Sequence, residues 1–166
     1  GEPTINPEYL DFIKYIRDEL PKAPISVMTN GCSIKHDIRN IEWMFYAGVT
    51  NLILDEYLDN NLEFIKKYLN EKNIPYEVYG EKGVKLFNEE KRVVFNPPIE
   101  TSKPTAVRNL NNHCGAGLPP LSSPKHVRCT KVFREMYFRW DGNVAICCDD
   151  FRGEYGIANI HDMSIE

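Results

Sequence analysis

The stretch that decides the fold of the second half of the chain reads Met136-Tyr137-Phe138-Arg139-Trp140-Asp141-Gly142-Asn143-Val144-Ala145-Ile146-Cys147-Cys148. Its central Asp-Gly pair supplies the positive φ that a tight turn needs, and β-branched or aromatic residues flank it, so it predicts a β-hairpin with arms at 136–140 and 144–148. A hairpin brings the base of its two arms together. Cys129 lies just outside one arm and Cys147 near the end of the other, and their thiols are therefore expected to meet where iron or zinc binds.

A further thiol follows at once in Cys148. Because successive side chains of a strand face opposite sides, Cys148 is expected to point away from Cys147, as a core residue or a spare thiol. We keep Cys148 as a third candidate metal ligand beside Cys129 and Cys147.

Helix and strand patterns alternate in the first half of the chain. Apolar residues at helical spacing predict helices near 9–20, 38–48 and 62–69, and short apolar runs predict strands near 25–28, 49–54 and 76–79. Strict alternation implies right-handed crossovers and a parallel sheet, which is an α/β fold. Residues 85–87 and 92–95 are interpreted as a hairpin or an edge pair.

The regular part ends at Asn96-Pro97-Pro98, and residues 99–125 are rich in Ser, Thr, Asn and Pro. This composition is typical of an extended connection that packs loosely. We place a domain boundary near residues 97–105.

Ligands of a parallel sheet bind beyond the carboxyl ends of its strands, where loops converge and helix N-termini present free N–H groups. Five residues fall at such positions and are the candidate binding residues: Gly1, Glu2, Thr29, Asn30 and Asp55.

The C-terminal motifs resemble a known family. The spacing Cys-x12-Gly-x4-Cys over 129–147, the run 147–153 and the following Gly156-Ile157-Ala158-Asn159-Ile160 look like the start of the SPASM or twitch auxiliary-cluster domain of radical S-adenosylmethionine enzymes. Two motifs near the other end agree with the same family. Gly1-Glu2-Pro3-Thr4 looks like the tail of its Gly-Gly-Glu-Pro motif, and Met28-Thr29-Asn30-Gly31 looks like the next barrel strand and its exit.

The resemblance implies a partial (β/α) barrel with a parallel sheet over residues 1–98, a linker over 99–128 and a truncated SPASM- or twitch-like β-hairpin region over 129–166. It also implies a 4Fe-4S iron–sulfur cluster and S-adenosylmethionine as cofactors. Gly1 and Glu2 would contact the amino group of S-adenosylmethionine, Thr29 and Asn30 would line its pocket, and Asp55 could take its ribose hydroxyls.

The chain also departs from the family pattern. The Cys-x3-Cys-x2-Cys triplet that holds the S-adenosylmethionine-cleaving cluster occurs nowhere in this sequence. We therefore expect an internal fragment or a reduced relative that does not turn over by itself, with no residue assigned a catalytic role. In the intact protein the resemblance implies modification of a peptide, protein or small molecule by hydrogen abstraction. The alternative is a non-catalytic zinc-binding or structural module that serves as a partner subunit.

Composition and charge argue against nucleic-acid binding, a membrane span and a secreted disulfide framework. The chain is 42% hydrophobic and 27% charged, which is typical of a globular protein. A net charge of -4 gives no basic field for nucleic acid or an anionic membrane surface, and no apolar stretch reaches the length of a membrane span. Five irregularly spaced cysteines argue against a secreted disulfide framework and favour a cytoplasmic location.

Overall fold

The computed structural model describes residues 2–55, 63–85, 90–97, 130, 133–148, 150 and 153–162. The chain divides into two compact units, Gly1–Ile99 and Glu100–Glu166, which we treat one at a time. Gly1, Cys129, residues 86–87 of the expected hairpin and the whole of the expected linker 99–128 lie outside the described residues. In the parts of the chain that the structure describes, no helix is long and apolar enough to cross a membrane.

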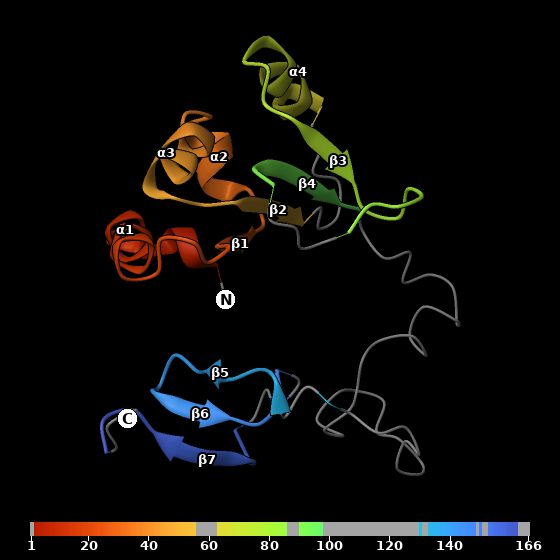
Figure 1. Cartoon of the computed structure of the whole chain (residues 1–166). Helices are drawn as coiled ribbons and strands as arrows, with labels where there is room; N and C mark the ends of the chain where they lie inside the picture. Colours follow the sequence, from red (N-terminus) through yellow and green to blue (C-terminus); the bar gives the residue numbers. More distant parts are fainter. Residues whose placement is uncertain are drawn as a thin grey trace. The chain divides into compact units, whose positions relative to one another are not determined.

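The first unit is built on a parallel sheet (Figure 1). Among the described residues its four strands lie in the order β1-β2-β4-β3, and all neighbours run parallel. The strands are β1 (Ser26–Thr29), β2 (Asn51–Asp55), β3 (Tyr76–Val78) and β4 (Arg92–Asn96). The helical segments are η1 (Pro3–Ile5), α1 (Tyr9–Glu19), α2 (Cys32–His36), α3 (Asn40–Ala47) and α4 (Glu63–Glu71). The expected α/β class with a parallel sheet is confirmed.

The helices pack on one face of this sheet. Alternate strand residues, including Val27, Leu52, Leu54 and Phe95, join apolar residues of all four α-helices in one buried core. The intervening strand residues, such as Ile53, point to the other face because side chains alternate along a strand. The sheet therefore has one helix-covered face and one face without a described helix.

The interpretation of 85–87 and 92–95 as a hairpin or edge pair was wrong. Strand β4 lies inside the sheet, parallel to β2 on one side and to β3 on the other. Its run Val93-Val94-Phe95 is fully or almost fully buried. A strand buried on both faces carries consecutive apolar residues, and that pattern is typical of an interior parallel strand.

The expected helix near 38–48 corresponds to α3, and the short helix α2 before it was not predicted. Helix α2 begins directly after Gly31, and α3 begins only at Asn40. The N–H of Arg39 donates to the Asp37 side chain between them, so this short turn separates the two. Helix α3 ends at Gly48 as expected, with that glycine at φ +117°.

The second unit contains, among its described residues, an antiparallel sheet of β5 (Tyr137–Phe138), β6 (Asn143–Ala145) and β7 (Gly156–Asn159), as Figure 1 shows. The predicted hairpin is confirmed, since Phe138 pairs with Val144 across β5 and β6. Gly142 in its turn has φ +80°, a conformation that favours glycine. The third strand, β7, was not predicted.

Candidate functional site

The Glu2 carboxylate joins the segment before η1 to the end of β1. Its Oε1 accepts hydrogen bonds from the hydroxyl of Thr29 at 2.6 Å and from the hydroxyl of Thr4 at 2.5 Å. Its Oε2 accepts one from the N–H of Asn30 at 2.8 Å. Three of the predicted binding residues, Glu2, Thr29 and Asn30, are thus in direct contact at the carboxyl end of β1.

The exit from β1 continues this network. The hydroxyl of Thr29 accepts from the N–H of Gly31 at 3.1 Å, and the side-chain oxygen of Asn30 accepts from the N–H of Cys32 at 2.9 Å. Thr29 is almost completely buried. The Thr-Asn-Gly segment is therefore held in one conformation by the Glu2 carboxylate on one side and by its own side chains on the other.

The two oxygens of Glu2 are unequally occupied. The N–H of Thr4 also donates to Oε1, at 3.1 Å, so that oxygen has three donors, whereas the bond to Oε2 comes from Asn30 alone among the described residues. A carboxylate offers about four acceptor positions shared over two oxygens. Oε2 therefore has acceptor capacity for a further donor.

The network keeps Glu2 ionised. Partial burial raises the pKa of its carboxyl, but the hydrogen bonds from Thr29, Thr4 and Asn30 outweigh that effect and hold the pKa below its usual value. The neighbouring Tyr9 responds in the opposite sense, because burial and the negative charge of Glu2 raise the pKa of its hydroxyl. An anionic group thus stands at this end of the sheet at neutral pH.

Asp55 lies at the same edge of the sheet, at the end of β2. Thr29 of β1 pairs with Leu54 of β2. The residues that come next in the two strands, Asn30 and Asp55, therefore both lie at the carboxyl edge of the sheet. The Asp55 Oδ1 accepts a hydrogen bond from the side-chain Nδ2 of Asn96 at 2.6 Å, and Asn96 ends β4. Sequence reasoning missed Asn96, although its position directly after the apolar run of β4 was a usable signal.

The hairpin places the two described cysteines differently. Cys147 is buried, whereas Cys148 is exposed, and neither forms a disulfide. Of the two alternatives expected for Cys148, a core residue or a spare thiol, the exposed side chain agrees only with the second. Among the described residues no group of three or more His, Cys, Asp or Glu side chains could hold a metal ion. Cys129, the expected partner of Cys147, lies outside the described residues.

Cys148 lies beside the hydroxyl of Tyr137 on β5. Burial and hydrogen bonds with the side chains of Glu135 and Cys148 raise the pKa of Tyr137 far above its usual value. The soft sulfur atoms of Cys147 and Cys148, which follow β6 of the hairpin, suit iron or zinc. These two thiols fit part of the ligand set that a thiolate-bound cluster needs.

Asp150 organises the turn that leads from the cysteines to β7, and sequence reasoning missed it as well. Its side chain is buried and accepts from the N–H groups of Glu154 at 3.0 Å and Tyr155 at 2.9 Å. Its carbonyl accepts from Nη1 of Arg139 at 2.8 Å. A buried aspartate that satisfies two backbone donors fixes the path of the chain just after the candidate ligands.

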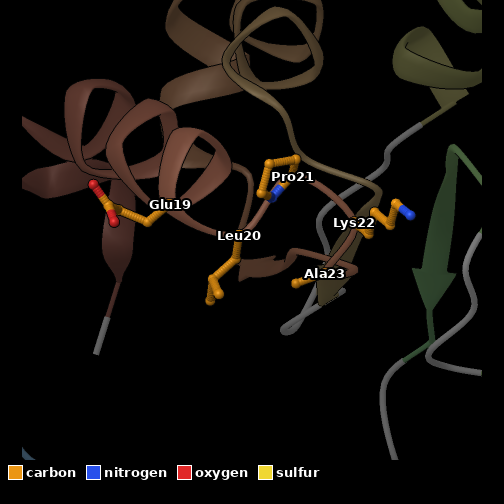
Figure 2. Close-up of a pocket in the computed structure, with 5 residues that line it drawn as sticks. All are labelled: Glu19, Leu20, Pro21, Lys22 and Ala23. Atoms are coloured by element: carbon orange, nitrogen blue, oxygen red, sulfur yellow. The ribbon is translucent and has the colours of Figure 1, made fainter.

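A surface pocket lies elsewhere on the first unit (Figure 2). The residues that line it form the turn between α1 and β1: Glu19, Leu20, Pro21, Lys22 and Ala23. This turn leads into the amino end of β1, opposite to the edge that carries Glu2. Arg17 braces it by donating to the carbonyls of Pro21 and Ala23, each at 2.8 Å. We therefore assign the pocket no part in the candidate site.

Comparisons with known proteins agree with this description. The SPASM family, an iron–sulfur cluster-binding domain, matches residues 129–166. No curated protein matches the chain in sequence. Two crystal structures of BtrN share its fold. The structure in complex with AdoMet and 2-DOIA has a TM-score of 0.66 at 16% identity, over 98% of this chain and 56% of BtrN. The structure in an open conformation has a TM-score of 0.59 at 14% identity, over 98% of this chain and 52% of BtrN.

The chain thus spans about half the length of the BtrN chains that it matches. The SPASM match covers the hairpin, Cys147, Cys148 and β7, and the shared fold covers the sheet whose edge carries Glu2. Residues 129–166 therefore match the SPASM iron–sulfur cluster-binding domain, and the chain shares the fold of BtrN.

Proposed function

We propose that this chain provides the S-adenosylmethionine pocket and the auxiliary iron–sulfur region of an enzyme that modifies its substrate by hydrogen abstraction. The observation that carries the proposal is the contact of Glu2 with Thr29 and Asn30 at the carboxyl edge of a parallel sheet. Ligands of such sheets bind at this edge. In BtrN, which shares the fold, AdoMet is bound together with 2-DOIA, which supports a small-molecule substrate here.

Each residue of the network has a defined part in this proposal. Oε2 of Glu2 accepts from the amino group of S-adenosylmethionine, at the position that Asn30 leaves open. The hydroxyl of Thr29 and the N–H of Asn30 hold the Glu2 carboxylate in one orientation. The side chain therefore loses little conformational entropy when the ligand binds. Asp55 takes the ribose hydroxyls. The family resemblance implies that Gly1 would contact the same amino group.

The sulfur atoms belong to the second unit. In this proposal Cys129 and Cys147 hold the auxiliary cluster, and Cys148 is a further candidate ligand. When bound, a cluster and S-adenosylmethionine together supply the one-electron chemistry of the reaction, and the protein supplies binding, orientation and exclusion of water. Because these 166 residues contain no Cys-x3-Cys-x2-Cys, we propose no part for them in holding the cluster that cleaves S-adenosylmethionine.

The test uses the protein that carries these residues, purified anaerobically and reconstituted with iron and sulfide. With a strong reductant and S-adenosylmethionine it should release 5′-deoxyadenosine, which chromatography detects. Glu2→Gln should reduce binding of S-adenosylmethionine, whereas Glu8→Gln, an exposed matched control, should leave binding unchanged. A protein that takes up one zinc per chain and binds no S-adenosylmethionine would instead be a structural or partner module, and the proposal would fail.

A further inference from the structure

The side chains of Asp55 and Asn96 form a pair on the face of the sheet without a described helix. The two residues are register partners at the ends of β2 and β4, and Nδ2 of Asn96 lies 2.6 Å from Oδ1 of Asp55. Their predecessors, Leu54 and Phe95, point into the helix-covered core. Alternation along the strands therefore places the acid and the amide on the opposite face.

Apolar side chains stand directly before this pair on the same face. Met28, Ile53 and Val94 form one row across β1, β2 and β4. Ile53 and Val94 are fully buried, whereas Met28 is 41% exposed at the edge strand. The row thus ends in an acid and an amide at the carboxyl edge, and Met28 is its exposed member. The proposal therefore rests on the contact between Asp55 and Asn96 at this edge, where ligands of parallel sheets bind.

We propose that Asn96 is a positioning residue for the recognition of the S-adenosylmethionine ribose by Asp55. The inference rests on the proposed function, because it takes Asp55 as the group that accepts the ribose hydroxyls. Asn96 donates to one of about four acceptor positions of the carboxylate and thereby sets its rotation, and enough positions remain for two hydroxyl donors. A carboxylate that is already oriented loses less freedom when it binds a diol.

The experiment compares S-adenosylmethionine with its analogue that lacks the ribose 2′-hydroxyl, using equilibrium binding to the reconstituted protein. The wild-type protein should bind S-adenosylmethionine about tenfold or more tightly than the analogue, because a hydrogen bond to a charged group is lost. Asp55→Ala should abolish this preference. Asn96→Ala should weaken S-adenosylmethionine binding and reduce the preference to about threefold or less, with little effect on binding of the analogue.

Two further variants separate positioning from packing. Asn96→Leu keeps the branched shape of asparagine, although it is larger, and it cannot donate, so it should lose the ribose preference as Asn96→Ala does. Asn51→Ala is the matched control, because Asn51 lies on the same face of β2 at its amino end and contacts Arg92 there. Asn51→Ala should lower stability but keep the preference.

The outcomes distinguish the two claims. If the wild-type protein binds no S-adenosylmethionine, both the proposed function and this inference fail. If Asp55→Ala loses the ribose preference while both Asn96 variants keep it, only this inference is overturned. If Asn51→Ala reduces the ribose preference as much as the Asn96 variants do, the inference is also overturned. A general destabilisation of the sheet would then explain the loss.

Discussion

The hydroxyl of Thr29, at the end of β1, donates a hydrogen bond of 2.6 Å to the carboxylate of Glu2, although 27 positions separate them in the sequence. Thr29 is almost completely buried, so this bond is shielded from water. Thr29→Val keeps the shape of the side chain but removes the donor. We expect the free energy of unfolding to fall by about 1–3 kcal/mol, measured by urea denaturation. Ser26→Ala, at an exposed position of the same strand, should change it far less; equal losses would contradict the role of the bond.

The stability of the first unit should depend on pH through Glu2. Its folded-state pKa lies below the usual value of 4.5, despite the opposing effect of burial, because the side-chain hydroxyls of Thr29 and Thr4 and two N–H groups bind the ionised form. A lowered folded pKa contributes stability that is present above pH 4.5 and is lost as the pH falls below it. Glu2→Gln cannot ionise. Thermal unfolding between pH 6 and pH 3 should therefore show a steeper loss for the wild type than for Glu2→Gln, and parallel curves would refute this.

Gly48 combines a special backbone conformation with a close contact. It ends α3 at φ +117°, and a Cβ there would lie 2.9 Å from Cβ, Cγ and Nε of Arg17. Gly80, at φ +101° with open space around it, is the matched control. Gly80→Ala should cost roughly 1–2 kcal/mol of stability from backbone strain alone. Gly48→Ala should cost at least about 1 kcal/mol more, because Arg17 must shift from its carbonyl partners. Equal losses of stability in Gly48→Ala and Gly80→Ala, measured by calorimetry, would show that the contact with Arg17 contributes nothing.

Asp150 should control the local order of the turn before β7. Asp150→Ala leaves the N–H groups of Glu154 and Tyr155 without their acceptor. Hydrogen exchange at these two amides should accelerate, by about tenfold or more if the lost bonds are worth 1–3 kcal/mol. Asp162→Ala, at an exposed position, is the control and should leave both rates unchanged. Unchanged rates in Asp150→Ala would remove the assigned role.

The sequence alone predicted the α/β class and the hairpin because both depend on local patterns. Apolar periodicity marked α1 and α4, and Asp141-Gly142 marked the turn. Strand order is not a local property. The position of β4 between β2 and β3 depends on which neighbours bury Val94, so the short apolar run was misread as an edge strand. Strand β7 escaped notice because its residues are largely exposed and carry little alternation.

The candidate site was predicted only in part, for a related reason. Motifs pointed to Glu2, Thr29 and Asn30, but their mutual contact depends on how the N-terminal segment folds back on β1. Asn96 belongs to no motif, and Asp150, although it lies in the run 147–153, was assigned no role from the sequence. Their importance appears only when the partners are seen: the carboxylate of Asp55 for one, and the backbone donors of a turn for the other.

The most direct test of the whole account is the metal content of the anaerobically reconstituted protein and its cysteine variants. We expect iron with a similar amount of acid-labile sulfide, lowered by Cys129→Ala and by Cys147→Ala but not by Cys32→Ala, the control at an exposed thiol of the first unit. One zinc per chain without sulfide, or an iron content that both hairpin variants leave at the wild-type level, would contradict a cluster held by these two sulfur atoms.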